Sequence, residues 1–293
     1  MSEPPVHQPR DHELLAAFDG FVSELVGLLN TAKVTTPLGA ASELVVSALV
    51  VKILRLGDSV LGLCRARHGN ETGIVLRTLL LAFANLKFVA MHPNREGAAL
   101  RFMRHLRYVR THLEADLVRP DVEGEGFPVQ APDAWTSDEA KLDQQWEEID
   151  AWARENNVVE ITRRRPPDRR GRPRPPLPWS WSGMSEAELF VAVGDLDAYR
   201  FYAWFSNEVH SNVVGLGELF GALNQGRVDL NDEVDFLRGP LAMAAKYLVR
   251  SLELYDEVQG MQIAAAIAAA SDAFSAQLRR YRPSAQLRGT LRG

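Results

Sequence analysis

Hydrophobic residues recur at intervals of three and four along most of the chain, which is the spacing of one face of an α-helix. No convincing run alternates apolar and polar residues as a half-buried strand does. We predict helices near Ser185 and Asp195, and over residues 11–31, 40–68, 74–91, 95–117, 137–157, 233–259 and 261–281. Pro93 ends one helix and Asn94 suits the N-cap of the next. The pattern predicts an all-α fold, an irregular multi-helix bundle.

The interruptions of this pattern define the domain organisation. We expect one all-helical domain over residues 11–282, between a disordered N-terminal tail (1–10) and a flexible C-terminal tail (283–293). Gly239-Pro240 is a candidate break within the helix at 233–259. The main interruption is an Arg/Pro-rich loop inserted at residues 158–183.

The core of that loop, Ile161–Trp179, has the most unusual composition in the chain. It contains seven arginines against one aspartate, together with six prolines, so it cannot form a helix. Three interpretations are open: a solvated linker, a contact for nucleic acid or an acidic partner through residues such as Arg164 and Arg169, or an extended polyproline ligand for another protein. Trp179 and Trp181, beside its C-terminal end, suit core anchors or stacking platforms for bases.

Composition excludes some classes of function without selecting one. A net charge of −5 at pH 7 means that any basic surface is local. Cys64 is the only cysteine, which excludes an intramolecular disulfide and a cysteine-based zinc site. The N-terminus lacks the apolar core of a signal peptide, and the most apolar stretch carries Arg77, Asn85 and Lys87, which a membrane span rarely tolerates. We expect a soluble, cytoplasmic protein with no cofactor and no membrane partner.

The stretch FYAWFSNEVHSN (Phe201–Asn212) contains the first candidate site. On a helical wheel, Ser206 and His210 share a face of small residues with Tyr199, whereas Phe205 points elsewhere. We expect this face to point inward because small residues let helices approach closely. Two interpretations of His210 are open: a core histidine satisfied by one hydrogen bond, or a general acid/base that titrates near neutrality.

Arg77 is the second candidate, because it lies within the most hydrophobic helix of the chain. An unpaired buried guanidinium is costly, so we expect a partner or a path to water. The candidate carboxylates are Glu208, Asp195 and Asp197, and an anionic ligand is the alternative. An arginine next to His210 would form a site for a phosphate or another anion.

The helix at 95–117 has a basic face that includes Arg101, Arg104 and His105. Two interpretations are open: a solvated basic face, or a surface that contacts the phosphates of a nucleic acid. His105 and His112 are seven residues apart, not the four that a helical zinc site uses, so we predict no metal here.

The order of these motifs resembles an uncharacterised bacterial family of all-helical proteins, catalogued as a domain of unknown function. The similarity covers roughly residues 40–222, in the motifs VLRTLLLAFANLKFVAMHPN (Val75–Asn94), WSGMSEAELFVAVGD (Trp181–Asp195) and YRFYAWFSNEVHSN (Tyr199–Asn212). The family pattern has an Arg followed four residues later by Glu on one helix, and Tyr…Ser…His-Ser on a later one. Arg77 matches the first helix, although Leu81 stands where the Glu is expected. The later pattern is matched by Tyr202, Ser206, His210 and Ser211.

More distantly, a helical bundle with an Arg and a His at a shared cleft resembles the HEPN superfamily, which includes dimeric RNA-cleaving or nucleotide-binding domains of defence and toxin systems. This resemblance implies RNA or a nucleotide as a partner, a homodimer, and metal-independent cleavage. His210 would be the acid/base and Arg77 would stabilise the phosphorane, with Tyr202 and Ser206 as further site residues. The superfamily signature has an Arg four to six residues before the His, and no arginine stands at that spacing here. The competing hypothesis is a non-catalytic helical interaction or regulatory module.

Overall fold

The computed structural model describes residues 9–32, 40–66, 68, 71–103, 105, 162–163, 177–178, 181–182, 184–209 and 237–281. It confirms the all-α fold, and residues 95–103 are helical as well as the labelled elements. The helices are α1 (Pro9–Thr31), α2 (Ala41–Arg65), α3 (Thr72–Met91), α6 (Glu186–Ala192), α7 (Leu196–Val209), α9 (Arg238–Gln259) and α10 (Ala264–Arg280). The helix expected at 137–157 lies outside the described residues, and the prediction of one domain over 11–282 stays a prediction.

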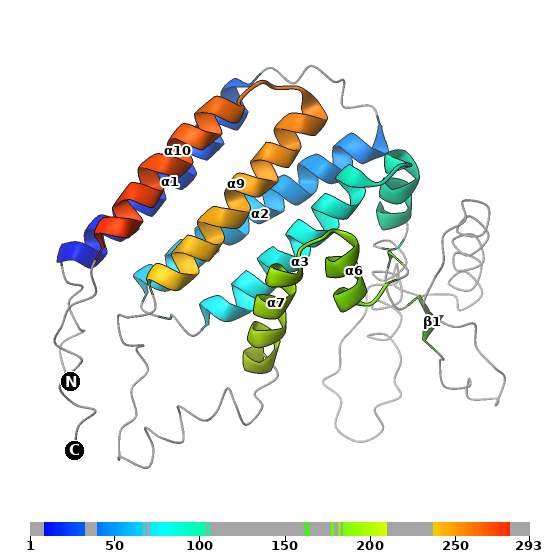
Figure 1. The fold of residues 1–293 in the computed structure, drawn as a ribbon, viewed down its shortest axis with the longest axis horizontal. Helices are drawn as coiled ribbons and strands as arrows, with labels where there is room; N and C mark the ends of the chain where they lie inside the picture. The colour runs from blue at the N-terminus through cyan, green and yellow to red at the C-terminus, as the bar shows by residue number, and fades with distance from the viewer. Residues whose placement is uncertain are drawn as a thin grey trace, which may run out of the picture.

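The helices form two stacked layers (Figure 1). In one layer α2 packs between α1 and α3; in the other, α10 and α9 lie side by side. α10 covers α1, α9 covers α2 and α3, and α7 packs on α3 beside the short α6. α3 is therefore the central helix for the site, because α7 and α9 both pack against it.

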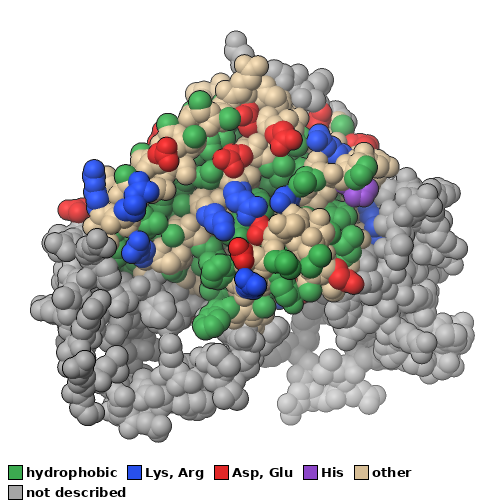
Figure 2. Space-filling view, in the orientation of Figure 1, with side chains coloured by type: hydrophobic (Ala, Val, Ile, Leu, Met, Phe, Trp, Pro, Cys, Tyr) green, Lys and Arg blue, Asp and Glu red, His purple; other side chains and the backbone are tan. Residues whose placement is uncertain are grey.

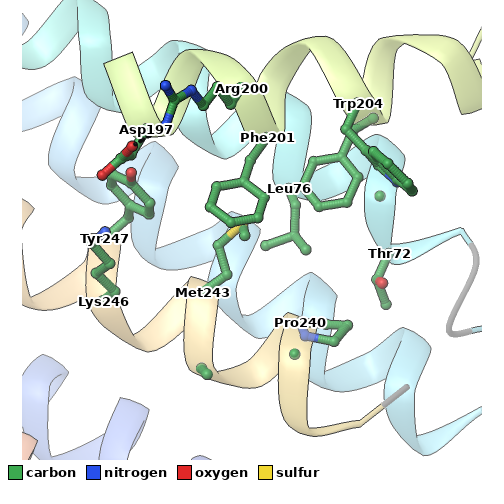
Figure 3. A pocket seen from close by; sticks show the side chains of 14 residues that line it. Thr72, Leu76, Asp197, Arg200, Phe201, Trp204, Pro240, Met243, Lys246 and Tyr247 are labelled. Carbon is green, nitrogen blue, oxygen red and sulfur yellow. Dashed lines mark hydrogen bonds and ion pairs between the residues drawn. The ribbon is translucent and has the colours of Figure 1, made fainter. Parts of the chain in front are cut away.

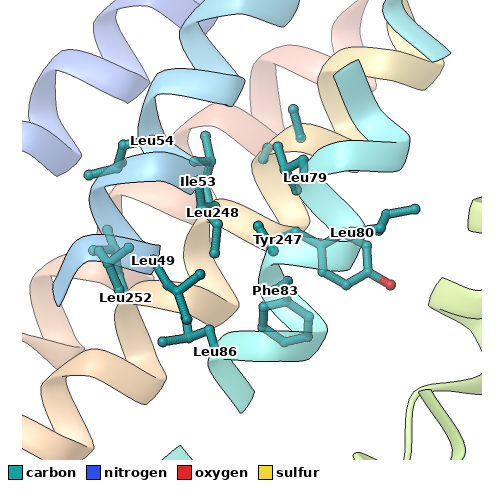
Figure 4. Close-up of a cluster of buried hydrophobic side chains, with 14 of the residues drawn as sticks. Leu49, Ile53, Leu54, Leu79, Leu80, Phe83, Leu86, Tyr247, Leu248 and Leu252 are labelled. Carbon is teal, nitrogen blue, oxygen red and sulfur yellow. The ribbon is translucent and has the colours of Figure 1, made fainter. Parts of the chain in front are cut away.

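The core lies where α2, α3 and α9 meet (Figure 4). Ile53, Phe83 and Leu248 come from these three helices, and each is at most 1% exposed. Phe83 also meets Tyr247 edge to face, with ring centroids 5.0 Å apart. Full burial of a large apolar side chain stabilises a fold by about 1.5–3 kcal/mol. This cluster therefore holds α3 in place against α2 and α9, and so sets the position of the α3 face on which α7 packs.

The α1–α10 pair is held by aromatic packing and by one buried hydrogen bond. Phe274 of α10 stacks on Phe21 with ring centroids 5.1 Å apart and meets Phe18 edge to face. The Tyr281 hydroxyl donates to Asp11 Oδ1 over 2.8 Å, which joins the end of α10 to the start of α1.

Side-chain caps are found at the starts of two helical segments, and the cap at Asn94 is the one that the sequence predicts. Asn94 Oδ1 accepts from the Gly97 N–H over 2.8 Å, as expected of an N-cap. Ser185 and Glu188 form a reciprocal capping box at α6. The expected break at Gly239-Pro240 is wrong, because α9 runs unbroken from Arg238. Pro240 lies in the first turn, where helical N–H groups have no partner and a proline costs little.

The two ends of the Arg/Pro-rich segment pair with each other. β1 (Thr162–Arg163) and β2 (Leu177–Pro178) form a short antiparallel ladder in which Thr162 faces Pro178. The residues between these strands lie outside the described part, so all three interpretations of the segment stay predictions.

Trp181, just after that segment, is a core anchor. It is 7% exposed, and its Nε1–H donates to Asn85 Oδ1 over 2.9 Å. Its ring also meets Phe88 and Phe102 edge-on. The anchoring interpretation is thereby confirmed for this tryptophan.

Two described helices are long and apolar enough to cross a membrane by length and composition alone: Asp11–Thr31 and Thr72–Met91. Half of the most apolar window of Thr72–Met91 is buried inside the bundle. The core helix of a soluble protein meets the same criterion, so this finding is weak evidence for a membrane span.

Candidate functional site around Arg77

Arg77 projects from α3 towards α7 and is half-buried between them. Its Nε–H donates to Ser206 Oγ over 2.8 Å, and Nη2 donates to the Tyr202 hydroxyl over 2.9 Å. Its guanidinium carbon is also 4.9 Å from the centroid of the Tyr202 ring. Two neutral hydroxyls and one aromatic face therefore hold this cation in place. The structure thus brings together three of the four residues predicted as catalytic.

Ser206 is fully engaged by this arrangement. Its hydroxyl donates to the backbone carbonyl of Tyr202 over 2.8 Å while it accepts from Arg77. A serine nucleophile needs a base that accepts its hydroxyl proton. Here the hydroxyl donates that proton in a hydrogen bond to a backbone carbonyl, which is not a base. Ser206 is therefore a positioning residue.

Tyr202 is a neutral positioning residue as well. The side chain is 3% exposed, and burial raises the pKa of its hydroxyl to about 12, with further contributions from a hydrogen bond to Glu186 and from the Glu186 charge. Arg77 acts in the opposite direction on this pKa but does not outweigh burial. Tyr202 therefore keeps its proton at neutral pH and cannot act as a general base there.

Two of the carboxylates expected to pair with Arg77 pair with other arginines. Asp195 pairs instead with Arg250 of α9, and its other oxygen accepts from a backbone N–H in the first turn of α7. Asp197 pairs instead with Arg200, at an N–O distance of 3.2 Å. Among the described side chains, Arg77 forms no ion pair with a carboxylate. Its charge is oriented by hydroxyl groups.

Several predicted residues lie outside the described part of the chain. His210 directly follows the last described residue of α7, so its distance to Arg77 is not tested. The side chain of Glu208, the third candidate carboxylate, is also outside. The same holds for the predicted nucleic-acid contacts Arg104, Arg164 and Arg169.

The basic face expected on the helix at 95–117 includes two described residues, Arg101 and His105, and neither is fully exposed. Arg101 is 3% exposed, and the Nδ1 atom of His105 is buried without a hydrogen-bond partner among the described residues. Burial first, and the Arg101 charge second, lower the pKa of His105 to about 4, so the ring is neutral at pH 7. The expectation of a solvated basic face is therefore wrong at Arg101, whereas His105 is only half-buried, and the contact with nucleic-acid phosphates stays a prediction.

The inward face of α7 is rotated from the predicted one. Tyr202 is the most buried of its aromatic residues, and Tyr199 is only half-buried. Phe205, expected to point away, packs against the core. Sequence reasoning also missed Glu186, which is the first residue of α6 and has no motif that marks it. Its proximity to Tyr202 depends on how α6 folds back onto α7.

No group of three or more His, Cys, Asp or Glu side chains in the described part of the chain could hold a metal ion. The single cysteine, Cys64, is buried on α2, and burial raises the pKa of its thiol to about 12. Such a thiol is inert as a nucleophile.

These features define an all-α protein in which the arginine of a central helix is oriented by hydroxyl groups of the helix packed on it. The chain belongs to a family of unknown function, DUF5677, whose model matches residues 43–227. This range includes Arg77, Tyr202 and Ser206, and it agrees with the range expected from the motifs. No curated protein and no solved structure matches the chain.

Proposed function

We propose that this protein binds the phosphate group of RNA or of a nucleotide at Arg77. The observation that carries the proposal is the set of groups that hold the guanidinium. Tyr202 and Ser206 fix its direction with neutral hydroxyls, and no described carboxylate forms an ion pair with it. A half-buried cation held in this way gains most from an anionic ligand, because charge-assisted hydrogen bonds are stronger than neutral ones.

The geometry of Arg77 suits a bound phosphate. The hydrogen bonds to Tyr202 and Ser206 use Nε and Nη2, while Nη1 has no described partner. Because the guanidinium is planar, fixing two of its nitrogens also fixes the direction of Nη1. Arg77 would then contact the phosphate, and Tyr202 and Ser206 would position it.

A reaction would require a further group, and we propose His210 for that role. It stands four residues after Ser206 in the sequence, and imidazole is suited to proton transfer near neutral pH. The proposal keeps the HEPN-like interpretation: metal-independent cleavage of RNA in a defence or toxin system, with Arg77 stabilising the negative charge on the non-bridging oxygens of the phosphorane.

The test is binding of a fluorescein-labelled single-stranded RNA, followed by fluorescence anisotropy at two salt concentrations. We expect Arg77→Ala to weaken binding by about tenfold or more, which is the value of one charge-assisted hydrogen bond. The matched control is Arg55→Ala, an exposed arginine on α2, which should change binding by less than about twofold. Equal losses in the two variants would reduce the proposal to nonspecific charge attraction and so refute it.

Cleavage is tested separately with the same RNA. If the protein is a nuclease, His210→Ala should abolish cleavage and leave RNA affinity nearly unchanged. Binding without cleavage in the wild type would refute the catalytic part while leaving the phosphate site in place.

One observation favours the second candidate function, a non-catalytic interaction module. Trp204 is 66% exposed and Phe201 is 44% exposed, on the side of α7 that faces away from Arg77. Large exposed aromatic side chains of this kind mark binding surfaces. If RNA binding is absent altogether, this function becomes the better one.

A further inference from the structure

A second site lies on the opposite side of α7. A pocket of about 1010 Å³ occupies the space between α7 and α9, with α3 as its floor (Figure 3). Its walls are mostly apolar: Leu76 comes from α3, Phe201 and Trp204 from α7, and Pro240 and Met243 from α9. This volume is at the upper end of the range of about 300–1,000 Å³ that is typical of small-molecule sites.

The pocket is separate from the Arg77 site. α7 turns Tyr202 and Ser206 towards Arg77, whereas Phe201 and Trp204 line the pocket. None of the three residues in the Arg77 cluster lines the pocket. A ligand here would therefore be bound by side chains that the proposed phosphate site does not use.

The charged residues of the pocket lie at one end. Figure 3 shows Asp197, Arg200, Lys246 and Tyr247 together there, while Trp204 lies at the other end. Asp197 and Arg200 neutralise each other in an ion pair of 3.2 Å. The Lys246 ammonium lies 5.3 Å from the centroid of the Tyr247 ring and forms no ion pair with a described residue. The charged end therefore has one surplus positive charge.

A buried polar atom lies at the same end. Tyr247 is 1% exposed, and its hydroxyl lies beside Arg250 of α9, although it makes no hydrogen bond of good geometry with a described residue. The hydroxyl is closed off from solvent, so the pocket presents the Tyr247 ring rather than its oxygen atom. On the wider surface, Figure 2 shows Lys and Arg side chains gathered over the middle of α9, next to apolar surface beside α7.

We propose that this pocket binds a small amphipathic anion, with its apolar body against Phe201, Trp204 and Met243 and its single acidic head group at Lys246. The apolar walls favour an alkyl or aromatic body, and a neutral body alone would leave the surplus charge uncompensated. A nucleoside polyphosphate fits poorly, because one surplus cation cannot balance several negative charges. A medium-chain fatty acid and an aromatic acid share the chemistry that the pocket recognises.

The test is isothermal titration calorimetry of the full-length protein with decanoate, 1-naphthoate, decyltrimethylammonium and AMP, each below its micelle concentration. We expect decanoate or 1-naphthoate to bind with a stoichiometry of one and at least about tenfold more tightly than the cation of equal chain length. The tighter of the two acids identifies the body as alkyl or aromatic. Equal binding of decanoate and decyltrimethylammonium, tighter binding of AMP, or no binding of either acid would overturn the proposal.

Matched variants locate the bound anion. Lys246→Glu should weaken acid binding by about tenfold, whereas Lys52→Glu, at an exposed lysine on α2, should not change it. Trp204→Ala should weaken binding, whereas Met91→Ala, at an equally exposed residue outside the pocket, should not. Arg77→Ala should leave acid binding intact, which separates this site from the phosphate site. Equal losses in Lys246→Glu and Lys52→Glu would overturn the placement.

Discussion

Replacing Tyr202 by phenylalanine removes one oxygen atom from the Arg77 cluster. The ring stays in contact with Phe190, at a centroid distance of 5.3 Å, and stays under the guanidinium of Arg77. What is lost is the 2.9 Å hydrogen bond from Nη2, together with the hydrogen bond of the hydroxyl to Glu186. A hydrogen bond to a charged group contributes about 1.5–3 kcal/mol, and this one is part-buried, so we expect the free energy of unfolding to fall by about 1–2 kcal/mol.

Urea denaturation of four proteins measures this value: wild type, Tyr202→Phe, Arg77→Leu and the double variant. If the hydroxyl acts through Arg77, Tyr202→Phe should cost less than about 0.5 kcal/mol once the arginine is gone, so the coupling energy should be about 1 kcal/mol. Tyr199→Phe is the control, because Tyr199 stacks on Tyr202 but has no such bond to Arg77. A coupling energy near zero, or equal losses at the two tyrosines, would refute the hydroxyl-held arginine.

Three further predictions concern stability. A Cβ at Gly57 would lie 2.8 Å from a leucine of α9, whereas one at Gly62 has nothing within 4 Å. In thermal denaturation, Gly62→Ala should therefore raise the free energy of unfolding by about 0.5–1 kcal/mol, and Gly57→Ala should be less stable than Gly62→Ala by at least about 1 kcal/mol. Equal effects would contradict the close packing of α2 on α9. The pKa of His105 is lowered to about 4 in the folded protein, whereas an unfolded histidine titrates near about 6.5. Between these two pH values the unfolded state binds the proton and the folded state does not, so the free energy of unfolding should decline by roughly 1 kcal/mol for each pH unit from about 6.5 down to about 4. His105→Gln should remove this decline, and identical pH profiles for the two proteins would show that the ring is not buried. Asp195→Asn disrupts a part-buried pair with an arginine of α9 and should cost about 1–3 kcal/mol. Asp197→Asn, in an exposed pair, should cost less than about 0.5 kcal/mol, and similar losses would contradict this difference in burial.

Local signals in the sequence were enough to predict most of the fold. The helical spacing of apolar residues located α1, α2, α3, α9 and α10 to within a few residues at the described ends. Asn94 was predicted as an N-cap from its place after Pro93, and a helix was expected near Ser185; the cap partners, Gly97 and Glu188, are each three residues further on. The prediction failed at Gly239-Pro240, where a proline in the first turn of a helix was taken for a break.

Interactions between distant segments could not be predicted in this way. Glu96 accepts from the backbone N–H groups of Ala41 and Ser42 at the start of α2, and these hydrogen bonds lower the pKa of its carboxyl group. More than 50 residues separate this cap from the helix that it caps, so no local motif indicates it. The pair of Asp195 with Arg250 has the same origin, because it depends on how α9 packs over α3.

The candidate site was predictable as a set of residues but not as a geometry. The motifs singled out Arg77, Tyr202 and Ser206, yet a carboxylate was the expected partner and hydroxyls were found. The helical wheel ranked Tyr199 as the inward tyrosine because a wheel divides a helix into broad faces. The packing of α7 on α3 and α6 decides that Tyr202 is the buried one.

The most direct test of the central claim is the ¹⁵Nε–H resonance of Arg77, assigned by comparison with Arg77→Lys. Its hydrogen bond to Ser206 should protect this proton from exchange and make the resonance observable. On titration with a short single-stranded RNA, we expect this resonance to shift and to saturate at one site per chain, while the backbone amide resonance of Arg55 on α2 stays in place. If the RNA binds to saturation and the Arg77 resonance does not move, the phosphate lies elsewhere and the central claim is wrong.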